Sequence, residues 1–268
     1  MIEAETVRGF HGWFDRYVRR FDSPDPEVRT NIRIKIEHSK NVCGEISALG
    51  SGIGMDGPGL RFAETAALFH DIGRFEQLSR YGTFLDDRSV DHAELGISVL
   101  SSEGVLNGLC PEDRDGIRRV ICNHNRFAIP DGESGFLLIQ SRLLRDADKL
   151  DIFRILIDYY RNGGGENSTV ALGLLDRNEI SRPVLEDLKA GRLVAMRHLA
   201  TIHDFKLMKM GWVYDIHYAP TFAAVAERGY LEAIRDALPD GPEVRQAYAQ
   251  VRSYLESRRQ GHSTAGPE

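Results

Sequence analysis

The apolar positions of this chain recur at helical spacing over most of its length. Between Glu3 and Phe21, apolar and aromatic side chains return every three or four residues, which predicts an amphipathic helix. The same spacing predicts further helices over about residues 28–49 and 60–72, from His92, from Pro111, and over about residues 135–160, 183–190, 193–210, 220–228 and 244–259. Hardly any stretch alternates with a period of two, so the predicted fold class is all-α.

Two breaks in this pattern predict loops. Residues 50–59 hold five glycines and a proline, a composition that favours irregular backbone. Residues 74–91 are rich in polar and aromatic groups and lack a clear apolar period, so we expect a long connection there. Long connections inside compact helical proteins are usually functional or mobile. The part from Tyr81 to Asp91 borders His92 and is a candidate wall of a substrate pocket.

We expect a single all-α unit with four parts. An N-terminal helix occupies residues 1–22, a helical core 28–160, a C-terminal helical extension 166–259 and a disordered tail 260–268. Neither an internal repeat nor a linker rich in Ser and Pro divides the sequence. Polar side chains on the late helix are expected to form a solvated face, and they are Arg197, His198, His203, Lys206 and Lys209.

Composition and charge narrow the functional classes. The 268 residues carry a net charge of −6, which argues against a surface built to bind duplex nucleic acid. The sequence lacks an apolar run near the ~20 residues that cross a bilayer, and acidic Glu3 and Glu5 stand where a signal peptide would be basic. Cys43, Cys110 and Cys122 are expected to be reduced, buried thiols. We therefore expect a cytoplasmic protein with no membrane partner.

Histidines and carboxylates fall on helix faces that are otherwise apolar. His38 shares a stripe with Ile34 and Val42, while His70 and Asp71 end an apolar run. Three residues of later helices share this property, namely His92, His124 and Asp148. A single buried histidine is more often a core residue, and an isolated His-Asp pair is more often a helix cap. Burying the whole set is costly unless a cation neutralises it, so the pattern predicts a divalent metal site.

Five motifs between Asn31 and Asp158 resemble the HD-domain superfamily, whose pattern is a histidine, a His-Asp pair and a distant aspartate in a helical core. The motifs are Glu37-His38-Ser39-Lys40-Asn41-Val42, His70-Asp71-Ile72-Gly73-Arg74, Asp91-His92-Ala93-Glu94-Leu95-Gly96, Asn123-His124-Asn125 and Ala147-Asp148-Lys149-Leu150-Asp151. Periodicity alone does not choose between Asp146 and Asp148, whereas the resemblance favours Asp148. The motif around His124 departs from members with two metals, which often have paired histidines there.

The resemblance implies a helical metal-dependent phosphohydrolase with a particular division of roles. It makes His38, His70, Asp71 and Asp148 ligands of a first metal. His92 and His124 then hold a second metal or, with one metal, protonate the leaving oxygen and bind the phosphate. Lys35 and Arg74 are candidates for binding phosphate oxygens, and Asp151 for orienting a ligand. Histidine and carboxylate donors suit one or two ions of Mn, Fe, Ni, Co, Zn or Mg.

Three functions are compatible with these residues. The first is hydrolysis of a phosphate ester, which we expect to be a small nucleotide or phosphodiester, by a metal-activated water, with Asp71, His92 and His124 at the reacting centre. The second is a mixed-valent di-iron oxygenase, because a few HD-domain proteins with the same six donors activate dioxygen. The third is a nucleotide-sensing module without catalysis, which would have no need of a complete donor set.

Overall fold

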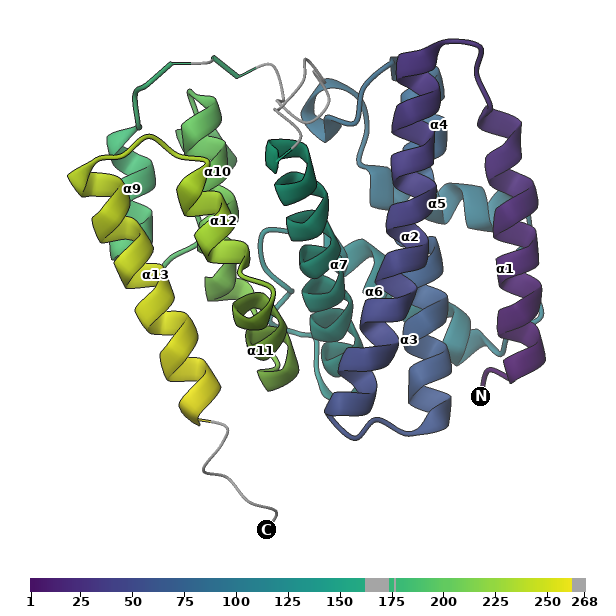
Figure 1. Cartoon of the computed structure of the whole chain (residues 1–268). Helices are drawn as coiled ribbons and strands as arrows, with labels where there is room; N and C mark the ends of the chain where they lie inside the picture. Colours follow the sequence, from purple (N-terminus) through teal and green to yellow (C-terminus); the bar gives the residue numbers. More distant parts are fainter. Residues whose placement is uncertain (162–173, 176, 262–268) are drawn as a thin grey trace. The chain divides into compact units, whose positions relative to one another are not determined.

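The computed structural model describes residues 1–161, 174–175 and 177–261 (Figure 1). Within these ranges the chain is built from helices, and the only extended pairing is an isolated bridge between Leu175 and Thr201. This architecture confirms the predicted all-α fold class. The contacts divide the chain into two compact units, Met1–Asp151 and Ile152–Glu268, with the boundary inside one long helix.

The first unit contains helices that approximate the predicted ranges. They are α1 (Ala4–Val18), α2 (Pro26–Gly52), α3 (Gly57–Phe69), α4 (Gly73–Tyr81), α5 (His92–Ser102), α6 (Pro111–His124) and the start of α7 (Gly135–Arg161), with short 3-10 turns η1 (Arg19–Phe21) and η2 (Asp86–Arg88). Helix α3 packs along α2, α1 and α6. Its second half is fully buried, as expected for a central helix, and Ala66, Leu68 and Phe69 are all 0% exposed.

Aspartates start three of these helices. The Oδ1 atom of Asp25 accepts hydrogen bonds from the backbone at the start of α2, and Asp91 does the same for α5. Asp56 accepts a bond from the Gly59 amide at the start of α3. Such bonds satisfy amides that have no partner inside the helix. The Asp56 cap lets α3 begin inside the glycine-rich stretch, and α2 continues to Gly52, so the loop predicted over 50–59 is wrong except for residues 53–56.

The connection predicted from Arg74 to Asp91 is also shorter than expected, because its first half forms α4. This helix has nine residues and buries Phe75, Leu78 and the polar Gln77. A polar residue on the inward face masks the helical period in so short a segment. Gly82 then ends the helix with φ +66°, a conformation that favours glycine.

Helices α4 and α5 cross at two glycines beside the His-Asp pair. A Cβ atom on Gly73 would collide with the backbone oxygen of His92 and lie 2.6 Å from the amide nitrogen of Gly96. A Cβ atom on Gly96 would lie 3.1 Å from Ile72. Because backbone atoms cannot give way as a side-chain tip does, only two glycines allow this approach. The crossing brings His92 beside Asp71, with its Nε2 atom 3.3 Å from Oδ1 of Asp71.

The described residues of the second unit continue α7 and form five further helices. They are α9 (Arg182–Lys189), α10 (Ile202–Met210), α11 (Ala219–Glu227), α12 (Tyr230–Asp236) and α13 (Pro242–Gly261), with 3-10 turns η3 (Met196–His198) and η4 (Gly211–Asp215). Helix α12 did not appear in the apolar pattern. The predicted helix over 193–210 starts only at Ile202, where Thr201 and Asp204 form a reciprocal cap. The predicted tail falls on the end of α13 and on residues 262–268, which lie outside the described ranges.

Two surface predictions need correction. The face of α10 is not uniformly solvated, because His203 is 7% and Lys209 is 8% exposed. Lys209 places its Nζ atom 3.5 Å from the ring centroid of Trp212, which explains how a buried ammonium is accommodated. Among the cysteines, Cys43 is buried as expected, whereas Cys110 is exposed.

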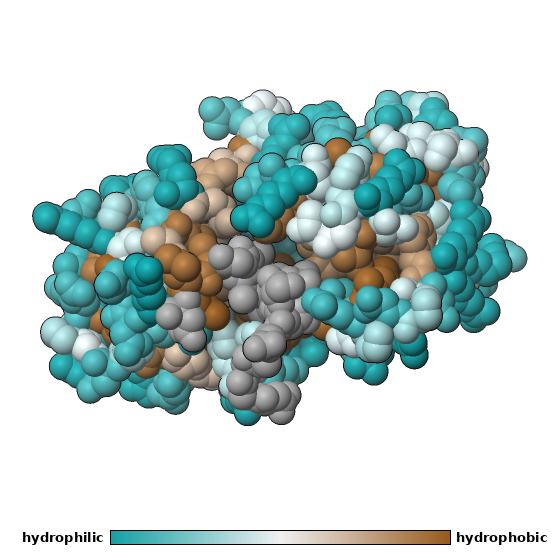
Figure 2. All heavy atoms as spheres, turned by 90° about the horizontal axis from the view of Figure 1, so that it is seen from above, coloured by the Kyte–Doolittle hydropathy of each residue, from teal (hydrophilic) through white to brown (hydrophobic). Residues whose placement is uncertain are grey.

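The outer surface agrees with the composition. Hydrophilic residues cover much of the face shown in Figure 2, with apolar residues between them. In the part of the chain that the structure describes, no helix has the length and apolar character to cross a membrane.

Candidate metal centre

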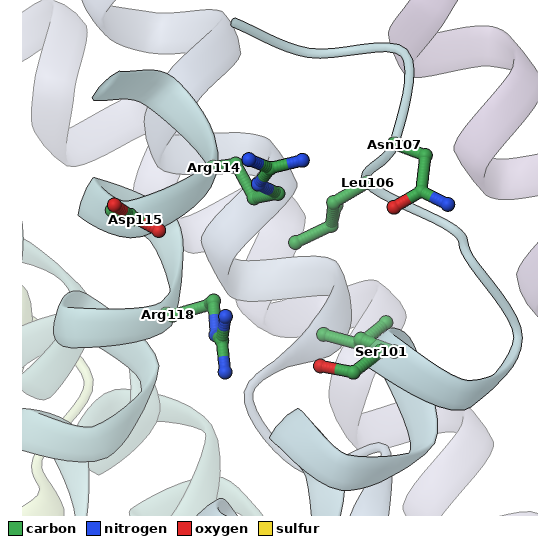
Figure 3. Close-up of a pocket in the computed structure, with 7 residues that line it drawn as sticks. Ser101, Leu106, Asn107, Arg114, Asp115 and Arg118 are labelled. Carbon is green, nitrogen blue, oxygen red and sulfur yellow. The ribbon is translucent and has the colours of Figure 1, made fainter. Parts of the chain in front are cut away.

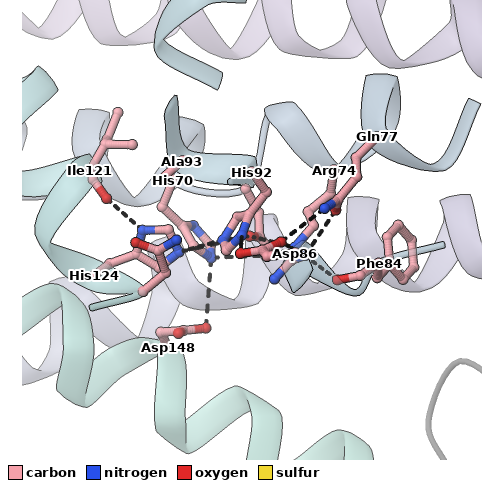
Figure 4. A network of polar contacts seen from close by, with 12 residues as sticks. His70, Arg74, Gln77, Phe84, Asp86, His92, Ala93, Ile121, His124 and Asp148 are labelled. Carbon is pink, nitrogen blue, oxygen red and sulfur yellow. Dashed lines mark hydrogen bonds and ion pairs between the residues drawn. The ribbon is translucent and has the colours of Figure 1, made fainter. Parts of the chain in front are cut away.

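The structure brings the six predicted metal ligands together inside the unit Met1–Asp151. His70, His92, His124 and Asp148 can be followed in Figure 4. Their helices place them differently, with His38 in the middle of α2, His70 and Asp71 just after α3, His92 at the first position of α5, His124 at the last position of α6, and Asp148 within α7. All four histidines and Asp71 are at most 7% exposed. Residues distant in sequence thus form one buried polar cluster in an apolar unit.

Asp71 lies between two sets of donors. Its Oδ2 atom is 3.5 Å from Nε2 of His38 and 3.7 Å from Nε2 of His70. Its Oδ1 atom is 3.3 Å from Nε2 of His92 and 3.8 Å from Nε2 of His124. We call His38, His70, Asp71 and Asp148 the His38 group, and Asp71, His92 and His124 the His92 group. The carboxylate of Asp71 belongs to both.

Asp148 completes the His38 group. Its Oδ1 atom lies 3.1 Å from Nε2 of His38 and 3.6 Å from Nε2 of His70. Asp146, two residues earlier on α7, is fully buried but belongs to none of the donor groups formed by the described residues. The structure therefore brings Asp148, and not Asp146, to the cluster, as the resemblance implied.

Every histidine of the cluster turns Nε2 inward and is held at Nδ1. The Nδ1 atoms of His70 and His124 contact backbone oxygens of Ala67 and Ile121, at 2.7 and 2.6 Å. The Nδ1 atoms of His38 and His92 contact carboxylates of Asp151 and Asp86, both at 2.7 Å. A carbonyl or carboxylate oxygen accepts hydrogen bonds, so each Nδ1 atom carries the proton. In its neutral form, each ring therefore directs an Nε2 lone pair into the cluster.

These lone pairs come close in two places. Nε2 of His38 is 3.2 Å from Nε2 of His70, and Nε2 of His92 is 3.0 Å from Nε2 of His124. Two facing lone pairs repel unless a proton or a metal ion lies between them. Imidazole nitrogens and carboxylate oxygens, without thiolate, are donors that suit Mn, Fe, Co, Ni and Zn. The donor chemistry of both groups therefore fits a divalent ion.

Charge in the cluster favours the same conclusion. Burial opposes ionisation of Asp71, but Lys35, His70, Arg74 and His92 outweigh it and hold the pKa of Asp71 well below its usual range. Burial also opposes ionisation of Asp148, yet the imidazoles of His38 and His70 beside it keep its pKa well below the usual range. Two buried carboxylates that stay ionised are a natural partner for a metal ion.

The histidines respond to these carboxylates in different ways. For His38, burial and Lys35 oppose protonation, but hydrogen bonds to Asp148 and Asp151 outweigh them and raise the pKa. Burial lowers the pKa of His124 to about 3, with help from His92 and His70. Burial and Arg74 likewise lower the pKa of His92. The His92 group thus keeps neutral imidazoles, the form that binds metal.

Lys35 and Arg74, the predicted phosphate ligands, both contact Asp71. Nζ of Lys35 donates to Oδ2 of Asp71 at 2.7 Å, and its side chain is 18% exposed. Nε of Arg74 lies 3.5 Å from Oδ1 of Asp71, while its Nη1 donates to the loop atoms Phe84 O and Asp86 Oδ1. Both cations also lie near the ring of Phe84. Lys35 is therefore the better placed of the two to meet a phosphate.

Sequence reasoning missed several residues that support the cluster. Asp86 and Gln77 were unremarkable polar residues of an expected loop, and their contacts with His92 and Arg74 required the fold of α4. Arg145 is 4% exposed and donates to the backbone oxygens of Asn123 and His124, both at 3.1 Å. Arg145, which lies one turn before Asp148 on α7, thereby holds the C-terminal end of α6 in place. The sequence signal for this role was the position of Arg145, a basic residue three positions before Asp148.

Asn123 shows what replaces a second histidine in its motif. Its Nδ2 atom donates to Oε2 of Glu133 at 2.9 Å and to Oγ of Ser141 at 3.2 Å. The side chain therefore ties α6 to the segment before α7. In the described structure, His124 is the donor that this motif provides to the cluster.

A separate hollow lies between α5, the segment after it and α6. Its volume is about 210 Å³, and its polar lining includes Ser101, Asn107, Arg114 and Arg118 (Figure 3). None of the predicted site residues lines it. The hollow is thus distinct from the buried cluster.

Comparison with known proteins identifies the region that carries the cluster. Residues 36–160 match the family model of the HD domain. This match contains all six clustered donors and excludes Lys35 by one position. No curated protein and no solved structure shows significant similarity to the chain.

Proposed function

Since residues 36–160 of this chain belong to the HD-domain superfamily, we propose that the protein is a metal-dependent phosphohydrolase that acts on a small nucleotide or phosphodiester. The observation that carries the proposal is the convergence of four Nε2 lone pairs on the two oxygens of Asp71. Such a shared carboxylate supports two ions rather than one. Paired divalent ions are the usual arrangement for displacement at phosphorus.

The residues divide into metal-holding and substrate-holding sets. His38, His70 and Asp148 would hold one ion, His92 and His124 the other, and Asp71 both. When bound, a divalent ion supplies an activated water and polarises a phosphoryl oxygen. Lys35 would bind a phosphate oxygen at the edge of the cluster, and the positive charge of Arg74 adds to the attraction of the anionic substrate.

The catalytic roles of His92 and His124 follow from the two-ion arrangement. As ligands, they leave their Nε2 atoms no proton to give, so the leaving oxygen would be protonated by water. In a one-ion site, one of them would instead supply that proton. The low pKa of His124, which burial holds at about 3, favours the ligand role over the acid role near neutral pH.

A substrate screen tests this function. The purified protein, loaded with Mn²⁺, Co²⁺ or Ni²⁺, is expected to release phosphate or a nucleoside product from an aryl phosphate and a nucleotide panel. The variant Asp71→Asn keeps the side-chain volume but loses the bridging charge, and we expect its turnover to fall at least ~100-fold. The measurement is phosphate release by colorimetry, with products separated by chromatography.

The alternative functions give opposite results. Two tightly bound irons and oxygen consumption, without phosphate release under any metal, would replace the hydrolase by the di-iron oxygenase. Nucleotide binding that persists in the absence of turnover, and that Asp71→Asn leaves unchanged, would identify a sensing module.

A further inference from the structure

The loop between α4 and α5 carries a carboxylate, Asp86, that contacts the cluster at the outward-facing ring nitrogen of His92. Oδ2 of Asp86 accepts a hydrogen bond from Nδ1 of His92 at 2.7 Å. Its Oδ1 atom accepts bonds from Nη1 of Arg74 at 2.9 Å and from Nε2 of Gln77 at 2.8 Å (Figure 4). Both oxygens of this carboxylate are therefore fixed, although the side chain is 33% exposed.

Arg74 and Gln77 also hold the loop around Asp86. Nη1 of Arg74 donates to the backbone oxygen of Phe84 at 2.5 Å. Nε2 of Gln77, which is fully buried, donates to the backbone oxygen of Val90 at 3.0 Å. The loop is thus pinned on both sides of Asp86. A carboxylate held in this way can orient the group that it contacts.

We propose that Asp86 is the positioning residue of the His92 group, which holds the His92 proton on Nδ1 so that Nε2 is available for the second metal ion. This inference rests on the proposed function, because it concerns the same metal centre. A neutral imidazole can carry its proton on either nitrogen, and a ring protonated on Nε2 has no lone pair for an ion. A carboxylate at Nδ1 selects the binding form and raises the basicity of the ligand.

The chain contains a matched control for this role. Asp151 contacts Nδ1 of His38 at the same 2.7 Å, but it serves the His38 group and is 1% exposed on α7. The two aspartates therefore make equivalent contacts in the two groups. Replacing one should affect one ion and leave the other bound.

The test compares the full-length Asp86→Asn and Asp151→Asn variants by Zn²⁺ titration calorimetry and elemental analysis. We expect the natural sequence to bind two Zn²⁺ ions. Asp86→Asn should lose 10–100-fold in affinity for one ion, while the signals of His38 and His70 in imidazole ¹⁵N NMR still shift at the first equivalent of Zn²⁺. In Asp151→Asn, the signals of His92 and His124 should be those that shift first.

The metal-free proteins give a second readout. In the natural sequence, imidazole ¹⁵N shifts should show His92 protonated on Nδ1. In Asp86→Asn they should show a mixture, because the amide group can turn either its oxygen or its nitrogen to the ring. Asp86→Glu keeps an acceptor and is expected to recover part of the lost affinity.

Several results would overturn the proposal. The first is binding of a single Zn²⁺ ion by the natural protein. The second is an Asp86→Asn variant that binds both ions with normal affinity or loses affinity equally in both groups. The third is an Asp86→Glu variant whose affinity is no higher than that of Asp86→Asn. Binding and NMR do not depend on turnover. Zn²⁺ binding as described, without phosphate release from any substrate, would therefore contradict the proposed function and leave the role of Asp86 intact.

Discussion

At the scale of single residues, the metal centre depends on where protons lie on four imidazole rings. Each ring has an oxygen acceptor at Nδ1, and two of these acceptors are backbone oxygens three residues earlier in the chain. Helix geometry places these backbone oxygens, so a mutation that changes the side chain of the same residue does not remove the acceptor. The carboxylate acceptors Asp86 and Asp151 can, which makes them the sensitive points of the site.

Acid should destabilise the metal-free protein before it protonates the carboxylates. Burial holds the pKa values of His92 and His124 below the ordinary 6.5, so the unfolded chain binds protons first as the pH falls. The contribution of His124 is complete above pH 6.5 and declines toward about pH 3, and that of His92 declines as the pH falls through its own lowered pKa. Each adds a slope of about 1.4 kcal/mol per pH unit. Urea unfolding in chelator at pH 7.0, 5.5 and 4.5 measures this decline.

One histidine works in the opposite direction. The raised pKa of His38 contributes stability at low pH that is lost as the pH rises through that pKa. Because His92 and His124 destabilise the protein on acidification and His38 stabilises it, we expect a net loss in the free energy of unfolding as the pH falls. His124→Gln should make the slope of this loss shallower. A free energy of unfolding that stays constant between pH 7.0 and 4.5 would contradict the assignment of buried neutral imidazoles.

The sequence predicted the donors that point into the cluster better than the residues that contact the Nδ1 atoms of these donors. His38 could be identified because a polar residue inside an apolar stripe stands out, whereas the choice of Asp148 over Asp146 required the resemblance to a known family. Asp86 could not, because it lies in a polar loop whose position depends on α4 and on the buried side chain of Gln77. Contacts between a loop and a helix have no period that a sequence would reveal.

At the scale of helices, the crossing of α4 and α5 positions the His92 group. Gly73→Ala would push a methyl group into the backbone oxygen of His92, and neither helix can yield without moving that ligand. We expect a loss of about 1–3 kcal/mol in the free energy of unfolding. We also expect weaker binding of one metal ion. Chemical denaturation and Zn²⁺ titration measure the two effects.

Gly44 provides the control for this substitution. It is an exposed position inside α2, and a Cβ atom there would meet nothing within 4 Å. Gly44→Ala should therefore stabilise the protein by roughly 0.5–1 kcal/mol, since glycine is a poor helix former. A Gly73→Ala variant as stable as Gly44→Ala would show that the two helices can separate without cost.

The helices themselves were predictable to different degrees. Long segments in which apolar residues recur over several turns, such as α2 and α7, lie close to their predicted ranges. The short helices α4 and α12 did not stand out, because two turns give too few positions to establish a period. The last turn of α2 and the start of α3, which Asp56 caps, lie in residues whose glycine content indicated a loop.

At the scale of the molecule, metal binding should be coupled to folding. The donors come from α2, α3, α5, α6 and α7 of the unit Met1–Asp151, so an ion that binds them stabilises their common arrangement. At a free Mn²⁺ concentration of 100 times Kd, the gain is about 2.7 kcal/mol. For a unit of this size, that gain raises Tm by roughly 5–10 °C.

Calorimetry with and without Mn²⁺ measures this shift. Asp71→Asn should abolish most of it, because Asp71 is common to both donor groups. An equal rise of Tm in the natural protein and in this variant would place the bound metal outside the cluster.

The loop over residues 82–91 has an evolutionary consequence. Surface loops usually diverge freely, and an enzyme can change its substrate by changing them. This loop cannot do so independently, because Asp86 stands six residues before His92 and contacts its ring. New substrate contacts there must arise around a retained aspartate. Descendants that lose it would bind the proposed second ion more weakly as they acquire a new pocket.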